Sequence, residues 1–310
     1  MANGILKDEA TYFGDSEKYT GDSGSNTNMW VIEDTYDFIA VMEMTDASSY
    51  MRLVNDIDFN EHDIYKKGFD NKNFTLTTKP YLYGDGHKIK NMVAINCSGY
   101  VFPFTYVENV DFVNLVSINC NQHFIINGSA NNCNFGIFFS NGALALASAT
   151  YNDCTFNMKG KVTNKNFIYC QKTNFNRCHF NFDISSCIRT GNASGTDSGF
   201  IYGSTTSQYE NSFVNCYFTG KLKDSSAYAY ILASNNTTLL NCYFAFEYTG
   251  NERISAGSAT YSTCFIDKEL FEKNGSTWSS TASGLSAITT AQAQDTDYLN
   301  SIGFAVVPIE

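Results

Sequence analysis

One four-residue phrase recurs through the middle of the chain and limits its fold more than any other feature. A polar residue, Cys, a variable residue and Phe stand in that order at 132–135, 153–156, 177–180, 215–218 and 241–244. Weaker copies lie at 109–112 and 263–266, so that successive copies begin 23, 21, 24, 38, 26 and 22 residues apart. A sequence period in this range is typical of solenoids and other repeat architectures, in which each repeat packs only against its neighbours.

A second, apolar phrase recurs at a similar spacing to the first. It occurs at 99–102, 123–126, 166–169, 199–202 and 229–232, with a degraded member at 143–146. Short alternating pieces, such as 160–163 and 220–223, lie between the two phrases. Three short strands in about 22 residues, joined by corners rich in Asn, Ser, Thr and Gly, form the coil of a parallel β-solenoid. We therefore predict an all-β chain in which residues 96–266 form the coils.

The cysteines of the first phrase are predicted to pack inside the coils. Side chains at i and i+2 of a strand point to the same face, so Cys and Phe face one way and form ladders when coils stack. The residues directly before and after Cys are then expected on the outer face of the strand. A free thiol behaves as a small hydrophobe, which favours packing over redox or metal chemistry for Cys133, Cys154, Cys178, Cys216, Cys242 and Cys264. The remaining cysteines are expected in other walls of the coil: Cys97, Cys120, Cys170 and Cys187.

The spacing of potential ligands gives no reason to expect a bound metal. Cys-x-x-Cys pairs are absent from the sequence, and the four histidines form no cluster of ligands: His62, His87, His123 and His179. Structural zinc sites combine such ligands at short spacings. The sequence predicts no cofactor.

The 38-residue step between two copies of the phrase contains a polar stretch at 189–198. We expect this stretch to leave the stack of coils as a loop. A loop that projects from a regular solenoid is either part of a binding surface or a tolerated surface insertion.

Both ends of a solenoid need caps, because they expose unpaired strand edges. A short amphipathic helix is predicted to start near Asp34, with apolar residues at 38, 39 and 42, and strands are expected at 50–54 and 74–77. We assign 30–95 to the N-terminal cap and first coils, and 267–310 to the C-terminal cap.

The two ends of the chain also carry a family resemblance. The segment Leu-Val-Asn-Asp-Ile-Asp-Phe at 53–59, followed by 81–91 with its Gly-Asp-Gly-His turn, resembles the opening of bacterial and phage β-helix proteins of the GLUG-repeat type. Segments 265–270, 284–294 and 298–304 resemble the end of the same family, with Phe304 where Trp is usual. The resemblance implies a single-stranded right-handed parallel β-helix. It also implies structural roles for the matched residues Gly84, Gly86, Asp56 and Asp58.

Residues 1–29 lie outside both the repeat and the resemblance. This segment is polar and rich in Gly and Ser, and it reads as an N-terminal arm for attachment or assembly. It has no basic start followed by an apolar run, so we expect no signal peptide and synthesis in a cytoplasm. No stretch approaches 18 consecutive apolar residues, so we expect no membrane insertion.

Composition narrows the function classes. Aromatic residues make up 15% of the chain and charged residues 16%, which excludes disorder and argues against helical bundles. The net charge of −11 argues against a nucleic-acid partner, because no basic stripe is available for the phosphate backbone.

Catalysis on a solenoid would need acids at equivalent positions of adjacent coils. A glycosidase requires two carboxylates about 5–10 Å apart, yet the position before Cys carries Asn132, Asp153, Arg177, Asn215 and Asn241. The acids of the central coils, Asp183, Asp197, Glu210 and Asp224, fall in different walls or loops. We therefore predict no catalytic residues.

These observations favour a non-enzymatic virion protein, such as a tail spike, fibre or capsid appendage of a bacteriophage. Its partners would be other virion proteins, reached through the N-terminal arm, and a glycan on the host surface. A homo-oligomer is expected, and a trimer is compatible with the sequence. The alternatives are a polysaccharide-degrading β-helix enzyme, either a glycoside hydrolase or a lyase, and a secreted bacterial adhesin.

Overall fold

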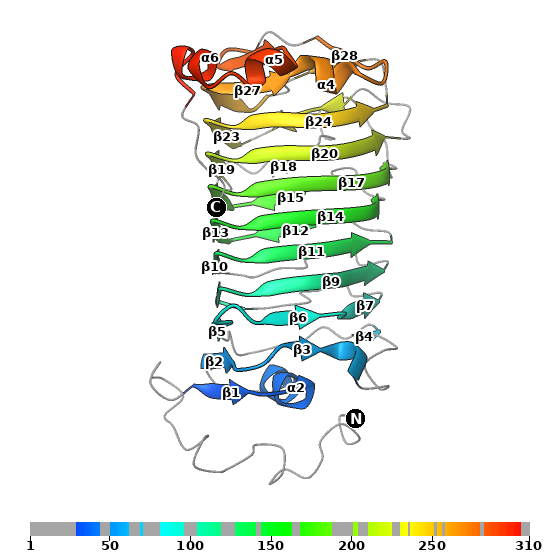
Figure 1. Ribbon diagram of the computed structural model, residues 1–310, viewed down its shortest axis with the longest axis vertical. Coiled ribbons are helices and arrows are strands. Elements are labelled where there is room, and N and C mark those ends of the chain that lie inside the picture. Colours follow the sequence, from blue (N-terminus) through cyan, green and yellow to red (C-terminus); the bar gives the residue numbers. More distant parts are fainter. Residues whose placement is uncertain are drawn as a thin grey trace.

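The computed structural model shows an all-β parallel solenoid of about seven turns with about 24 residues per turn. The coils stack along the long axis of the molecule between a helix at one end and three helices at the other (Figure 1). The structure describes residues 29–43, 50–61, 69–70, 81–95, 104–118, 128–140, 144–162, 168–187, 201–203, 210–224, 230–234, 236–250, 253–255, 258–279 and 282–304. The predicted fold class is confirmed, with coils slightly longer than expected.

The first wall of the coil is a ten-stranded parallel sheet of short strands. Its order is β1 (Trp30–Ile32), β2 (Tyr50–Leu53), β5 (Tyr81–Tyr83), β8 (Tyr106–Glu108), β10 (Ser129–Asn131), β13 (Thr150–Asn152), β16 (Asn174–Asn176), β19 (Asn211–Val214), β23 (Thr237–Leu240) and β26 (Thr260–Ser262). Neither sequence phrase marks this wall.

The second wall holds the longest strands and faces the viewer in Figure 1. Its twelve-stranded sheet runs through β3 (Ile57–Asp58), β6 (Lys88–Lys90), β9 (Asp111–Ile118), β11 (Asn134–Phe139), β14 (Thr155–Val162), β17 (His179–Cys187), β20 (Tyr217–Asp224), β24 (Tyr243–Thr249), β27 (Cys264–Asp267) and β29 (Leu285–Ile288). The other two strands of this sheet are the short β4 (Phe69–Asp70) and β7 (Val93–Ile95), which pair with each other, and β7 also pairs with β9.

The third wall consists of two smaller parallel sheets. One contains β12 (Leu144–Ala147), β15 (Ile168–Gln171), β18 (Ile201–Gly203) and β22 (Ala233–Ser234), and the other β21 (Tyr230–Ile231), β25 (Arg253–Ser255) and β28 (Thr277–Trp278). Where the structure describes it, the second sequence phrase marks this wall, including its degraded member at 143–146. The copies at 99–102 and 123–126 lie outside the described residues. The copy at 229–232 is offset from expectation, because Ile201 pairs with Ala233 rather than with Ile231.

The predicted inward ladders are present in the core. The six phrase cysteines are buried, and neighbouring phenylalanine rings stack at 4.6–5.1 Å through Phe112, Phe135, Phe156, Phe180, Phe218 and Phe244. Rings from the first wall meet this ladder edge-on, as Phe175 does with Phe180 at 5.2 Å. Cys170 lies buried in the third wall as expected, whereas Cys187 ends the second-wall strand β17. Cys97 and Cys120 are outside the described residues.

The residue before each phrase cysteine is a corner rather than a strand residue. Sequence alternation placed it on the outer face of a strand, but the backbone there is left-handed, with φ from 50 to 55° at Asn109, Asn132, Asp153, Arg177, Asn215, Asn241 and Thr263. From Asn109 to Asn241, the backbone N–H of each corner residue donates to the last first-wall carbonyl of the next coil, as Asn132 does to Asn152 at 2.9 Å. Asparagine and aspartate tolerate this conformation better than most residues do.

The glycine-containing pieces at 160–163 and 220–223 are also different from expectation. They are not separate strands, because β14 and β20 run through them. Gly160 and Gly220 have φ of 108° and 104°, and the pairing of β14 with β17 shifts after Gly160. Glycine thus bends a continuous strand at a conformation that other residues adopt at a steric cost.

Helix α2 (Thr35–Glu43) caps the first coil where the sequence predicts a helix. The Asp34 carboxylate accepts hydrogen bonds from the amides of Tyr36 and Asp37, at 2.8 and 3.0 Å, and so acts as the N-cap. Phe38 packs against Phe59, which begins the short 3-10 helix η2 (Phe59–Glu61). The expected strand at 50–54 is β2, whereas 74–77, 189–198 and the arm at 1–28 lie outside the described residues.

The C-terminal cap contains α4 (Lys268–Glu272), α5 (Thr290–Ala293) and α6 (Thr296–Ser301). It folds back onto the outer face of the second wall, where Phe304 meets Phe265 edge-on at 4.4 Å. Leu299 and Ile288 complete this small apolar cluster, with Tyr243 packed against it. In the last coils, the outward-facing residues at the start of the second-wall strands are aromatic, and the C-terminal cap covers them.

The residues of the GLUG-type resemblance that the structure describes have structural roles. A Cβ at Gly84 would lie 2.3 Å from the Asn109 carbonyl oxygen, and Gly86 has φ of 87°. Asp58 accepts from the amide of Asn60 at 2.9 Å, while Asp56 accepts from the amide of Lys88 at 3.0 Å.

Candidate functional site

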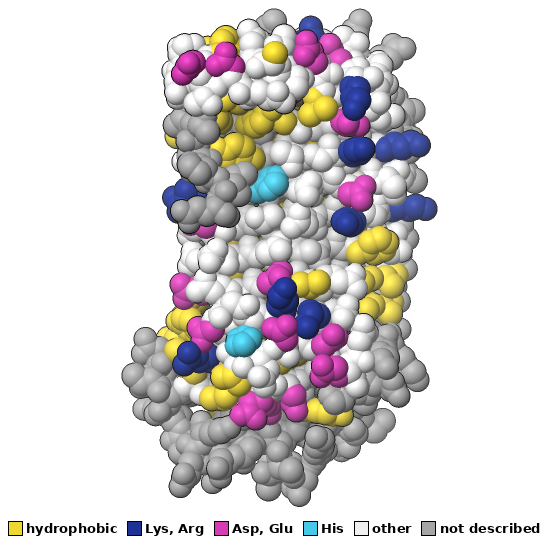
Figure 2. Space-filling view, in the orientation of Figure 1, with side chains coloured by type: hydrophobic (Ala, Val, Ile, Leu, Met, Phe, Trp, Pro, Cys, Tyr) yellow, Lys and Arg dark blue, Asp and Glu magenta, His cyan; other side chains and the backbone are white. Residues whose placement is uncertain are grey.

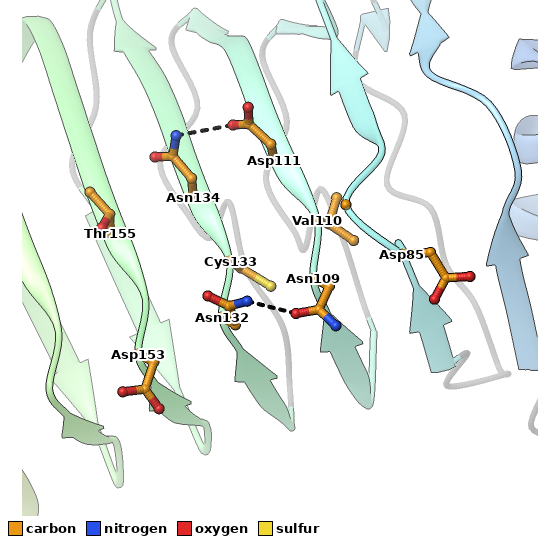
Figure 3. A pocket seen from close by; sticks show the side chains of 10 residues that line it. Asp85, Asn109, Val110, Asp111, Asn132, Cys133, Asn134, Asp153 and Thr155 are labelled. Carbon is orange, nitrogen blue, oxygen red and sulfur yellow. Dashed lines mark hydrogen bonds between the residues drawn. The ribbon is translucent and has the colours of Figure 1, made fainter. Parts of the chain in front are cut away.

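A polar groove runs along the corner between the first and second walls. Its volume is about 650 Å³, and it crosses four coils from Asp85 to Asp153. One border is the row of corner residues, and the other is the first outward position of the second-wall strands (Figure 3). Figure 2 shows mainly uncharged groups over the middle of the second-wall face, with charged side chains toward both ends and along one edge.

The corner row presents amides at a spacing set by the coils. The Asn132 Nδ2 donates to Asn109 Oδ1 at 2.7 Å, and farther along the same row Asn241 donates to Asn215 at 2.6 Å. Each such bond uses one of two donor hydrogens and one of two acceptor lone pairs of a side-chain amide. The bond between Asn132 and Asn109 therefore fixes two side-chain amides that line the groove.

A second row of amides crosses the outer face of the second wall. Asn134 donates to Asp111 at 3.0 Å, Asn157 to Asn134 at 2.8 Å, and Asn181 to Asn157 at 3.0 Å. Parallel in-register pairing brings Asp111, Asn134 and Thr155 side by side. The groove therefore lies between two fixed rows of donors and acceptors.

The carboxylates of the groove each contact a basic side chain. Arg177 holds Asp153 through two hydrogen bonds of 2.6 Å, and Lys88 lies 3.4 Å from Asp111. Asp85 forms an ion pair with Arg52. All three pairs are partly exposed to solvent, so each contributes little to stability, but each fixes a carboxylate at the groove.

Asp85 and Asp111 both line the groove, although sequence reasoning did not predict that they lie near each other. Lys88 follows Gly84 by four positions, whereas Asp111 follows Asn109 by two, yet Lys88 pairs with Asp111. This longer first corner hides the equivalence from a fixed-period alignment. The strand register is the signal that aligns the two coils.

The buried thiols form a column in which the reactive thiolate form is disfavoured along most of its length. Burial raises the pKa of Cys133, Cys154, Cys178, Cys216 and Cys242 well above the ordinary value. Each thiol has backbone carbonyl partners, such as Asn176 O at 3.4 Å from Cys178 Sγ. At the end of the column, hydrogen bonding from Cys242 lowers the pKa of Cys264, which is only 3% exposed. These contacts agree with the predicted packing role.

One imidazole and one hydroxyl meet on the second wall beyond the groove. His179 Nε2 lies 2.6 Å from Thr219 Oγ1, and burial lowers the pKa of His179. A nucleophilic triad adds a third group that orients the base. Among the residues that the structure describes, no carboxylate contacts this imidazole.

Within the described ranges, no group of three or more His, Cys, Asp or Glu side chains is arranged to hold a metal ion. No helix in those ranges is long and apolar enough to span a bilayer.

Comparisons with known proteins support the fold and leave the function open. No family model and no curated protein matches the sequence. The structure is similar to the crystal structure of a "putative immunoglobulin A1 protease" from Bacteroides ovatus, with a TM-score of 0.51 and 13% identity over 91% of this chain and 90% of that chain. At this identity the likeness concerns the fold alone. The GLUG-type relationship stays a prediction.

Proposed function

We propose that this chain is a non-enzymatic binding solenoid of a surface appendage, and that the polar groove holds a glycan of a host surface. A bacteriophage tail spike, fibre or capsid appendage is the setting that the sequence favours. The observation that supports the proposal is the pair of polar rows that repeat from coil to coil along the groove.

The chemistry of these rows suits sugar hydroxyls. A hydroxyl both donates and accepts, and an amide held by one bond to its neighbour retains a donor and an acceptor. Successive coils lie about 4.8 Å apart, so an extended polysaccharide along the axis meets a new set of polar groups at each step. Asn109, Asn132 and Asn134 would supply most of these contacts.

The contacts of the carboxylates favour binding over hydrolysis. Glycoside hydrolysis needs one carboxyl group that gives up a proton and a second that acts as base or nucleophile. Here both oxygens of Asp153 accept from Arg177, and Asp111 accepts from Asn134. We infer that these groups act as fixed hydrogen-bond acceptors.

A panel of bacterial surface polysaccharides tests the proposal with the full chain. Asn132→Gly removes a groove amide while glycine keeps the left-handed backbone, and we expect affinity to fall about threefold to tenfold, the value of one hydrogen bond. Asn215→Gly is the matched control, because it changes the same corner row beyond the groove. Equal binding by the parent and Asn132→Gly, or no retained polysaccharide, would overturn the proposal.

Turnover assays test the non-enzymatic part separately. The printed name of the Bacteroides ovatus protein makes immunoglobulin A1 a necessary substrate in the assay. We expect neither cleavage of this antibody nor release of reducing ends or unsaturated sugars from a bound polysaccharide. Sustained release of either product would replace the proposal with an enzymatic function.

The appendage setting has its own test. Neighbouring genes for capsid or tail proteins, together with the chain in purified particles, are the expected finding. A cell-wall anchor encoded downstream would instead support the adhesin alternative.

A further inference from the structure

Four tyrosines form a strip on the outer face of the first wall near its N-terminal end. The strand register places Tyr50 beside Tyr81 and Tyr81 beside Tyr106. Ring centroids are 4.4 Å apart for Tyr50 and Tyr81, 6.2 Å for Tyr81 and Tyr106, and 5.5 Å for Tyr83 and Tyr106. All four residues are partly exposed. Three successive coils therefore present aromatic rings to solvent.

The core does not account for this tyrosine strip. The inward residues of the same strands are Met51, Leu82 and Val107, all fully buried. In the following coils the outward column that contains Tyr50, Tyr81 and Tyr106 continues as Ser129, Thr150 and Asn174. Aromatic side chains thus occupy the column only in the first coils.

Polar groups border the tyrosine strip where it approaches the groove. Asn131 donates to the Tyr106 hydroxyl at 3.0 Å, and Asn131 is the residue before Asn132 of the corner row. Asp85, which ends the groove, pairs with Arg52 from strand β2. The strip and the groove are therefore adjacent parts of one surface that turns around the corner.

The phenols of this surface are held in their neutral form. Burial raises the pKa of Tyr83, and the neighbouring Tyr106 raises it further. Burial is also the main cause of the raised pKa of Tyr106. Both phenols are uncharged at neutral pH, and the Tyr106 hydroxyl is fixed in place by hydrogen bonding to Asn131.

We propose that the tyrosine strip stacks against the rings of a neutral polysaccharide and extends the groove around the corner onto the first wall. A sugar ring has an apolar C–H face and a rim of hydroxyl groups. An aromatic ring can stack on the C–H face while neighbouring ordered amides form hydrogen bonds with the hydroxyls. The inference rests on the proposed function, since it identifies the kind of glycan that the same surface takes.

The charge of the surface selects against acidic sugars. Its bases are Arg52, Lys88 and Arg177, and each already contacts an aspartate. Glu108, in register with Tyr83, adds a further negative charge. A uronate or sialylated chain would meet this acid without gaining one of those three cations, whereas neutral hexoses and N-acetylhexosamines carry no such penalty.

The test titrates the full chain with oligosaccharides in matched neutral and acidic pairs, hexose against uronate. Tyr81→Ala and Tyr106→Ala are each expected to weaken binding of the neutral member about threefold to tenfold, which is the usual value of an aromatic contact. Tyr106→Phe keeps the ring and should retain most of the affinity. Phe138→Ala, which removes an exposed ring from the second wall, is the matched control.

Each outcome bears on a defined part of the inference. Unchanged affinity in both tyrosine-to-alanine variants would overturn the strip while leaving the groove intact, and tighter binding of the acidic members would overturn the neutral specificity. Absence of binding to every member would overturn the proposed function as well. If the variants do not fold, nitration of the parent chain decides: a bound neutral oligosaccharide should protect Tyr81 and Tyr106, and equal nitration with and without it would refute the strip.

Discussion

At the scale of single residues, the phrase phenylalanines show how one side chain supports several coils. Phe180 is fully buried and stacks on Phe156 at 4.8 Å and on Phe218 at 4.9 Å. Phe175 and Phe213 of the first wall also contact its ring. A cavity at this position would therefore open in the middle of the stack, where both neighbouring coils are held in place.

Phe180→Ala should be among the most destabilising substitutions in the chain. Truncation of a buried Phe usually costs about 3–5 kcal/mol, because transfer and cavity costs add. Thermal unfolding of Phe180→Ala and Phe138→Ala measures the effect, since Phe138 is 43% exposed and its loss should leave the melting temperature nearly unchanged. Equal melting temperatures for the two variants would contradict this account of the core.

At the scale of elements, sequence reasoning predicts the inward half of each strand better than it predicts the corners. Cys and Phe recur at i and i+2, and only a strand interior satisfies both. The asparagine before them is compatible with an exposed strand position and with a left-handed corner, so alternation alone does not distinguish the two. Prediction of the groove requires the strand register that pairs Lys88 with Asp111. The repeat period does not reveal this register, because the first corner is longer than the others. Its corner members Asn132 and Asp153 were visible in the repeat, whereas Asp85 was not.

The bend in the long strands depends on glycine. A Cβ at Gly160 would lie 2.2 Å from the Phe139 carbonyl oxygen, in addition to the strain of a φ of 108°. Gly275 has a φ of 87° but open space around it, so it separates the two effects. We expect Gly160→Ala to lower the melting temperature clearly more than Gly275→Ala, which should cost only about 1 kcal/mol for its backbone. Similar losses in both variants would show that the close approach is relieved by movement.

The N-terminal helix gives the molecule a pH-dependent element. Burial raises the pKa of Asp37 from 3.8 to about 6. A raised carboxyl pKa means that the folded state binds the proton more tightly, so this stabilisation is complete below pH 3.8 and is lost as pH rises through about 6. Asp37→Asn should thus raise the melting temperature at pH 7.5, by about 1–4 °C, and the difference should vanish near pH 4. Melts of parent and variant across this range check it, and a constant difference would contradict the assignment.

At the scale of the whole molecule, the C-terminal cap separates a stack of open strands from solvent. Phe265 lies on the outer face of the second wall and is 1% exposed because Phe304 and Leu299 cover it. Exposed apolar surface beside strand edges promotes pairing between molecules. The cap therefore keeps the end of the solenoid from becoming a template for another copy.

The double substitution Leu299→Ala with Phe304→Ala should uncover Phe265 and increase self-association. Light scattering at rising protein concentration measures the mass, and Ile302→Ala is the control because Ile302 is already 38% exposed in the same segment. We expect the control to match the parent and the double variant to form larger species. No increase in mass for the double variant would mean that the cap protects the end in another way.

The parallel pairing of each coil with only its neighbours also has an evolutionary consequence. A gene that duplicates one repeat, such as the 21 residues from Cys133 to Asp153, adds a coil whose inward Cys and Phe already fit the coils on either side. Both caps stay unaltered, and the molecule becomes longer by one rise of about 4.8 Å. The new coil also brings one more corner residue, so the reach of the polar rows grows in whole steps while their chemistry is inherited.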